Sequence, residues 1–471
     1  MNHDPIVELK RRSFLLGGVA AVSGVLNSVT SLAAEQGNDP LPEFYDGYLR
    51  GIADRVASIR QRAKVTDSFF FITDPHIPAN AKRSGKMIAN LIRATGINKV
   101  LCGGDLPCAF GDKAVIDATL RDYRTFWLDP IEAAGGIVYT AKGNHDFTIR
   151  KDWHVDEGWT YTSCEARDFL MSWSGNRKGV TNAKDPTACY FYVDFPEAKM
   201  RYIVADSQDT ATERHESFWG VRYGIHETQA EWLASVAFAT IPEGYSVVVM
   251  HHIPCAPIVT PSAGERKVQE FLRKILDAYQ NRRKLQLCGQ EFDYTGARGR
   301  IVMDLTGHRH ADRQTFCDGI LYVTGACDAA YADYKIGSTF CGTLPDKKRG
   351  TIYEQTFDIY QLAEDGTLYA TRVGGGQDRI YHTGPRTVKK GERLTFATGM
   401  KGKIRWCCYD GDDCVQTDKE KVPEKRYTFF TKHATIAEAE GVLLAQEPGD
   451  VLVQALDEQF NKEIFCVRVV G

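Results

Sequence analysis

The stretch Phe69-Phe70-Phe71-Ile72-Thr73-Asp74-Pro75-His76 decides the fold of this chain. Its apolar run predicts a buried strand, and polar side chains follow at the carboxyl end of that strand. Four more segments repeat the arrangement: 99–102 before Gly103-Gly104-Asp105, 137–140 before Gly143-Asn144-His145-Asp146, 246–250 before His251-His252, and 301–305 before Gly307-His308-Arg309-His310. Because open α/β sheets bind ligands beyond the carboxyl ends of their strands, the five segments predict one shared site.

The polar side chains of these segments are carboxylates, one amide and imidazoles, which are ligands for hard or borderline metal ions. Asp74 and His76 are two residues apart, as are His308 and His310, so each pair can point to the same side of a loop. Gly307 gives the backbone room to turn there. The sequence therefore predicts a metal site.

In order and spacing, the five motifs closely resemble the calcineurin-like metallophosphoesterase family, over roughly residues 66–330. The resemblance implies an α/β fold, a four-layer α/β/β/α sandwich. It also implies phosphoester hydrolysis by a hydroxide bound at a dinuclear site with two divalent or trivalent ions, manganese, zinc or iron.

The resemblance assigns a role to each candidate ligand. Asp105 would bridge the two metals, because a shared carboxylate offsets their repulsion. The other ligands would form two groups: Asp74, His76 and His310 on the first metal, and Asn144, His251 and His308 on the second.

The fourth motif leaves a choice between two histidines. The family pattern is His-x-Pro, whereas this chain has His251-His252-Ile253-Pro254, one residue longer if His251 is the ligand. We expect His251 to be the ligand, since it shares strand parity with Val247 and Val249. His252 would then lie behind the ligands or face the substrate.

The catalytic residues are also implied by the resemblance. His145 would protonate the leaving oxygen, and Asp146 would orient it and keep it protonated, because a neighbouring carboxylate raises the pKa of a histidine. Arg309 lies between two ligands and could contact phosphate; a solvent-facing Arg309 is an equal alternative.

The substrate class is less constrained. Asp206-Ser207, followed by Gln229, Trp232 and Leu233, is similar to a stretch common in the phosphodiesterase branch of the family. We therefore favour a phosphodiesterase slightly, acting on a small-molecule or lipid phosphoester. The alternatives are a phosphomonoesterase (phosphatase or nucleotidase) and a non-catalytic surface binding protein; complete ligand positions disfavour the latter.

Composition excludes some partners. The chain has 471 residues, 43% of them hydrophobic and 25% charged, and a net charge of −3. Nucleic-acid binders are normally basic, so no nucleic-acid-binding signature is present. The 13 cysteines are an odd number, so one is unpaired or bonds another chain. Cys407, Cys408, Cys414 and Cys466 could form disulfides after export, in pairings that the sequence leaves open.

Residues 1–34 resemble a twin-arginine (Tat) export signal, with Lys10-Arg11-Arg12-Ser13-Phe14-Leu15-Leu16, a mildly apolar stretch and Ala33-Ala34. The mature protein would be periplasmic or extracellular; an uncleaved N-terminal anchor is the alternative. No later segment is apolar enough to span a bilayer.

Three regions are predicted: the signal at 1–34, a metallophosphoesterase domain at 40–375, and a small all-β domain at 385–471. Turn signals at 374–377 and 384–385 suggest a linker. The last region resembles bacterial immunoglobulin-like domains, with Trp406 on an early strand; an unrelated β-domain is the alternative. Helices are expected at 43–63, 84–96, 114–133 and 265–281, and the strands of 312–373 are expected to complete a second sheet.

Overall fold

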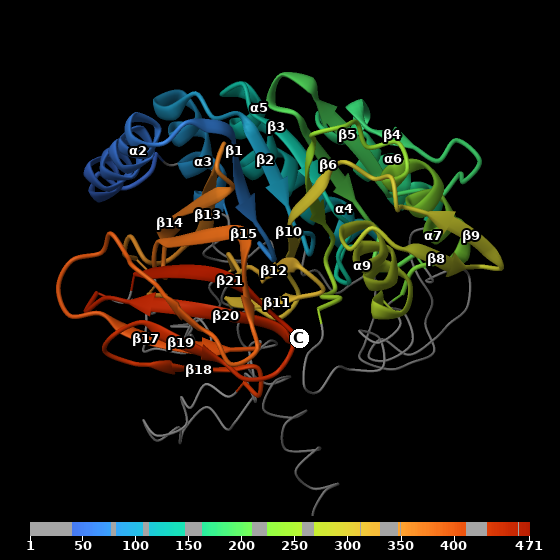
Figure 1. The fold of residues 1–471 in the computed structure, drawn as a ribbon. Coiled ribbons are helices and arrows are strands. Elements are labelled where there is room, and N and C mark those ends of the chain that lie inside the picture. Colours follow the sequence, from blue (N-terminus) through green and yellow to red (C-terminus); the bar gives the residue numbers. More distant parts are fainter. Residues whose placement is uncertain are drawn as a thin grey trace, which may run out of the picture.

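Two mixed β-sheets lie face to face at the centre of the molecule, with helices on their outer faces (Figure 1). The computed structural model describes residues 40–76, 82–106, 113–146, 163–209, 224–256, 268–310, 312–329, 347–348, 350–410, 431–459 and 461–471. In this part of the chain, the helix–sheet–sheet–helix layering agrees with the four layers expected from the sequence.

The first sheet has nine strands in the order β17-β20-β21-β15-β14-β13-β1-β2-β3. Strands β1, β2 and β3 run parallel, and β13 joins β1 antiparallel. The strands are β1 (Val65–Ile72), β2 (Lys99–Cys102), β3 (Ile137–Thr140), β13 (Thr356–Ala363), β14 (Thr367–Gly374), β15 (Arg379–Lys389), β17 (Arg405–Tyr409), β20 (Gly449–Leu456) and β21 (Lys462–Val470).

The second sheet has seven strands in the order β11-β12-β10-β7-β6-β5-β4, and its central strands β6, β7, β10 and β12 are parallel. The strands are β4 (Val180–Thr181), β5 (Phe191–Phe195), β6 (Met200–Val204), β7 (Ser246–Met250), β10 (Arg300–Thr306), β11 (Arg313–Cys317) and β12 (Ile320–Thr324). A separate hairpin joins β8 (Lys284–Leu287) to β9 (Gln290–Asp293).

The helices follow the predicted apolar spacing. In α2 (Phe44–Arg62), the buried residues recur at helical intervals: Tyr45, Leu49, Ile52, Val56 and Ile59. The expected helix at 114–133 forms three consecutive segments, α4 (Lys113–Tyr123), a π-helical turn (Arg124–Leu128) and α5 (Asp129–Ala133). The others are α3 (Lys82–Thr95), α6 (Ser163–Met171), α7 (Glu227–Trp232) with a π-helical turn (Leu233–Phe238), and α9 (Lys274–Gln280) after a π-helical turn (Gln269–Arg273); short 3₁₀ turns lie at Asn176–Lys178 and Pro196–Ala198.

Three apolar cores separate the layers. One lies between the first sheet and α2, α3 and α5, and another lies between the second sheet and α7 and α9. The third fills the space between the sheets and includes Phe69, Tyr202, Leu305 and Tyr360. In central strands such as β6, β7 and β10, both faces are therefore buried, which explains their nearly continuous apolar runs.

The C-terminal strands differ from the expectation in their connections. Gly384-Pro385 lies within β15, which pairs with both β14 and β21, so the first sheet continues into the C-terminal region. Strands β13 and β14 also join this first sheet, so the prediction that residues 312–373 complete the second sheet is correct only for β11 and β12.

The C-terminal region also contains a three-stranded sheet of β16 (Arg393–Thr395), β19 (Val442–Ala445) and β18 (Ala434–Ala437). It shares an apolar cluster with β17, β20 and β21, and Trp406 is buried in that cluster. An extra β-rich region is therefore present, while its immunoglobulin-like identity stays a prediction.

None of the described helices is both long enough and apolar enough to cross a lipid bilayer. Nine cysteines whose side chains the structure describes are free thiols, and they include Cys407, Cys408 and Cys466. Cys414 and the predicted signal at 1–34 lie outside those ranges.

Candidate metal centre

The predicted ligands lie on loops that leave β1, β2, β3, β7 and β10 at their carboxyl ends, where the two sheets meet. Five of these residues have left-handed backbone conformations: Asp74 (φ 52°), His76 (φ 45°), Asp105 (φ 57°), His308 (φ 70°) and His310 (φ 55°). Such conformations are unfavourable for residues with a side chain and concentrate at functional sites. The surrounding fold therefore stabilises conformations that these loops would not adopt alone.

Glycines let the loops approach closely. A Cβ on Gly143 would fall against the backbone nitrogen and carboxylate of Asp105, and one on Gly307 would fall against the side chains of Thr73 and Asp74. The glycine positions of the motifs thus serve the packing of one ligand loop on another.

Four donors gather on one side of the centre: Asp74, His76, Asp105 and His310, whose ligand atoms lie within 4.8 Å of one another. His310 Nε2 is 3.1 Å from both Asp74 Oδ1 and His76 Nε2. This is the set predicted for the first metal.

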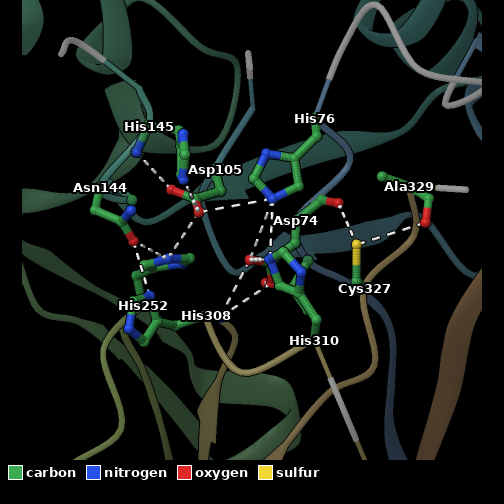
Figure 2. A network of polar contacts seen from close by, with 12 residues as sticks. Asp74, His76, Asp105, Asn144, His145, His252, His308, His310, Cys327 and Ala329 are labelled. Atoms are coloured by element: carbon green, nitrogen blue, oxygen red, sulfur yellow. Dashed lines mark hydrogen bonds and ion pairs between the residues drawn. The ribbon is translucent and has the colours of Figure 1, made fainter. Parts of the chain in front are cut away.

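A second group lies on the other side of Asp105 (Figure 2). Asn144 Oδ1 is 2.8 Å from His308 Nδ1 and 3.0 Å from His252 Nε2, which is itself 3.1 Å from Asp105 Oδ2. The same Asp105 oxygen lies 3.8 Å from His76 Nε2 in the first group. Asp105 therefore stands between the two groups, as a bridging ligand would.

The structure differs from the sequence prediction at the histidine pair. His252 is fully buried in the second group, whereas His251 Nε2 lies 2.9 Å from Asp304 Oδ2, away from that group. His251 does share strand parity with Val247 and Val249. Those residues, however, face the helices, while Val248 and Met250 face the other sheet. His252 has the same parity as Val248 and Met250, so its side chain lies on the side of the strand that leads to the metal centre.

The orientation of His252 fits a metal ligand. Its Nδ1 donates to the carbonyl oxygen of Gly103 at 2.7 Å, which leaves Nε2 to present a lone pair towards Asp105 and Asn144. Nε2 faces two oxygen acceptors, so a cation or a proton is needed to make that approach favourable. The donor set thus fits the metals that the family resemblance implies.

Asp146 lies beside the site and joins two of its loops. Its carboxylate accepts the backbone N–H groups of Gly143 (2.6 Å), Leu106 (2.5 Å) and Asp105 (3.3 Å), which joins the second and third loops. His145 is bound through its backbone N–H to Asp105 Oδ1 at 2.7 Å, and its side chain is 19% exposed. Both residues are at the site, and Asp146 holds the loops that carry the ligands.

The buried donors of the centre shift one another's pKa values. Burial alone would raise the pKa of Asp74, but His310 and other histidines lower it to about 2. Burial alone would lower the pKa of His252, but Asp105 raises it to about 9. Burial lowers the pKa of His308 well below its usual value, and the charge of His252 lowers it further. Metal binding at His252 must therefore displace a proton.

One thiol at the centre, in a loop 325–345 that the sequence places near the metals, is not among the predicted ligands. Cys327 follows β12 and donates its Sγ–H to the carbonyl oxygen of Asp74 at 3.2 Å, and its sulfur belongs to a group with His76 and His310 within 4.8 Å (Figure 2). Its position just beyond a parallel strand was the available signal. Arg309 is half-buried between His308 and His310, and its backbone N–H donates to Gly307 O at 2.8 Å.

Residues 68–289 match the family model for calcineurin-like phosphoesterases. The matched segment, just under half of the chain, is similar to this family of hydrolases. This match and the converging donors make it a metallophosphoesterase, an enzyme that hydrolyses phosphoric esters, with a candidate dimetal site.

Solved structures with a similar arrangement are distant. A dimetal phosphatase from Danio rerio has 14% sequence identity and a TM-score of 0.46, covering 67% of this chain and 99% of its own. The purple acid phosphatase PPD1 from yellow lupin has 13% identity and a TM-score of 0.34, covering 65% of this chain and 51% of its own. The NAD nucleotidase of Haemophilus influenzae has 12% identity and a TM-score of 0.32, covering 67% of this chain and 55% of its own. No curated protein sequence matches the chain significantly.

Proposed function

We propose that this metallophosphoesterase is an exported phosphodiesterase with a dinuclear metal site. The observation that carries the proposal is the position of Asp105 between two groups of donors, 3.1 Å from His252 and 3.8 Å from His76. In this proposal Asp74, His76 and His310 would hold one ion, Asn144, His252 and His308 would hold the other, and Asp105 would serve both. Ions of manganese, zinc or iron bound there would supply charge neutralisation for the phosphoryl group and lower the pKa of a water molecule.

The protein's own side chains contribute positioning and proton transfer. His145 is held by its backbone against Asp105 and remains partly exposed, so its imidazole can reach a substrate and protonate the leaving oxygen. Asp146 keeps the Asp105 and Gly143 loops together through three N–H groups. Arg309, next to two proposed ligands, is proposed to contact the phosphoryl oxygens.

The choice of diesters rests on the segment after β6. Gln229 accepts the backbone N–H of Asp206 at 2.8 Å and donates to Asp209 at 2.9 Å, and Ser207 Oγ accepts the N–H of Ile253 at 2.9 Å. The residues that resemble the phosphodiesterase branch therefore hold the loop that carries His252. This supports a site built as in that branch, with a small-molecule or lipid diester as substrate.

The test is hydrolysis of p-nitrophenyl phosphate and bis(p-nitrophenyl) phosphate by metal-stripped protein with added manganese, zinc or iron, and with Asp105→Asn as control. We expect metal-dependent bis-ester turnover that the substitution abolishes. Turnover of the mono-ester alone would move the assignment to a phosphomonoesterase. Bis-ester turnover that survives Asp105→Asn would remove the dinuclear mechanism.

Export is proposed from Arg11-Arg12 and the following apolar stretch. Cell fractionation of the protein and of an Arg11→Lys, Arg12→Lys variant tests it, because the twin arginines are the export signal. We expect the variant to remain in the cytoplasm at its unprocessed mass, while the unaltered protein is exported. Equal distribution of both would contradict the proposal.

A further inference from the structure

A second group of metal-ligating side chains lies on the helix-covered face of the seven-stranded sheet. His251, Cys255 and Asp304 are all buried, and their donor atoms lie within 4.8 Å of one another. None of the three belongs to the donor set around Asp105.

The sheet register brings this group together. Asp304 on β10 pairs with Val249 on β7 and with Tyr322 on β12. Val249, Tyr322 and Cys255 all belong to the apolar core between the second sheet and its helices. The carboxylate of Asp304 is therefore placed in an apolar layer, where an ionised group is costly without a partner.

Polar groups in this layer lack enough partners. The His251–Asp304 contact at 2.9 Å uses only Nε2 of the imidazole. His251 Nδ1 and the hydroxyl of Tyr322 are buried without a hydrogen-bond partner in the described part of the chain. The thiol of Cys255 is fully buried too, and burial together with Asp304 raises its pKa well above the usual value.

We propose that His251, Cys255 and Asp304 bind a third metal ion, a zinc-class transition-metal cation. Thiolate, imidazole and carboxylate are the protein ligands of Zn²⁺, whereas the harder ions Mg²⁺ and Mn²⁺ avoid thiolate. On binding, the Cys255 thiol releases its proton to solvent as the sulfur–metal bond forms. The cation offsets the charge of Asp304 and binds His251 through Nε2, the nitrogen that faces Asp304. The Tyr322 hydroxyl on the neighbouring strand offers a further oxygen.

The dimensions are compatible with this ion. Zinc bonds of about 2.0–2.3 Å place tetrahedral ligands roughly 3.3–3.8 Å apart, so donors within 4.8 Å need to contract by about 1.5 Å at most. The site would join β10 to the segment 251–255, which also carries His252. The ion would be structural and would stabilise the position of this segment, because all three protein ligands of the ion are buried.

Cobalt substitution tests the proposal on the full chain. A Co²⁺–thiolate bond gives a charge-transfer band in the near ultraviolet that imidazole and carboxylate ligands do not give. We expect this band in the Co²⁺-loaded protein and its loss in Cys255→Ser, with one fewer zinc ion per chain after Zn²⁺ loading. Cys466→Ser, another fully buried thiol in the other sheet, is the matched control and should keep the band.

Two further variants keep the test decisive. Cys327→Ser removes the thiol beside the dinuclear centre. If the charge-transfer band is lost in Cys327→Ser and kept in Cys255→Ser, the proposal is overturned. Asp304→Asn keeps the shape of the side chain and should weaken zinc retention at least tenfold, even if Cys255→Ser fails to fold. An unchanged zinc count in Asp304→Asn, with no thiolate band in the unaltered protein, would also overturn it. No readout requires phosphoester turnover, so the result is independent of the proposed function.

Discussion

Replacing His252 by Asn separates the structural assignment of the fourth ligand from the one favoured by the sequence. The imidazole makes three contacts: Nε2 to Asp105 at 3.1 Å and to Asn144 at 3.0 Å, and Nδ1 to Gly103 O at 2.7 Å. The shorter Asn side chain cannot make both the Gly103 contact and the contacts at the centre. The substitution therefore removes one ligand of the second metal and the hydrogen bond that orients it.

The expected effect is large. Loss of an outer-shell partner alone costs 10–100-fold in metal affinity, so loss of the ligand itself should weaken the second ion by about 100-fold or more. This corresponds to about 2.8 kcal/mol, since each tenfold change is about 1.4 kcal/mol. Bis(p-nitrophenyl) phosphate turnover should fall at least as far, because an ion at this position is proposed to stabilise the reacting phosphoryl group.

Manganese is the metal to use in this assay. Mn²⁺ prefers oxygen and nitrogen ligands to thiolate, so equilibrium dialysis with elemental analysis would count the dinuclear centre and not the His251–Cys255–Asp304 group. We expect two Mn²⁺ ions in the unaltered protein and one in His252→Asn. His251→Gln is the matched control and should retain both ions and measurable turnover.

The opposite pattern would refute the assignment of His252 to the second metal. In that pattern His252→Asn keeps two manganese ions and full turnover, while His251→Gln loses one ion. Circular dichroism and thermal unfolding of both variants establish that each is folded before the comparison is made.

Three other perturbations test the surrounding structure. Gly143→Ala should lower bis-ester turnover more than tenfold and destabilise the fold by about 1–3 kcal/mol, because the added methyl group meets Asp105; steady-state kinetics and urea unfolding measure both. Glu463→Gln should cost about 1 kcal/mol at pH 7 by weakening the 2.6 Å contact with His382. Burial alone would raise the pKa of Glu463, but the contacts with His382 and Thr398 lower it below the ordinary 4.5, so the contribution is present above that pH and is lost as pH falls through the lower value of the folded state. Urea unfolding at pH 7 and pH 4 should show the difference between the two proteins shrinking on acidification; a difference that grows would contradict this. Phe69→Ala should cost about 3–5 kcal/mol, because the ring is fully buried between the sheets; a loss under 1 kcal/mol in thermal unfolding would contradict that packing.

The sequence alone determined the resemblance to the family, the strand-end positions of the motifs and the chemical types of the donors. These are local properties: an apolar run forms a strand, and the residues after it lie at the sheet edge. Asp74, His76, Asp105 and His310 converge as predicted because each is fixed by the end of its own strand.

Tertiary structure decided what depends on contacts between distant segments. The alternation along β7 divides its residues into two sets. Only the packing of the second sheet shows that Val247 and Val249 face the helices. For this reason His252, and not His251, lies at the metal centre. Likewise, β21 joins β15 through non-local hydrogen bonds, and Cys327 reaches Asp74 across 253 residues of sequence. Periodicity specifies that the faces of a strand alternate, whereas the identity of the layer against each face depends on the assembled sheets.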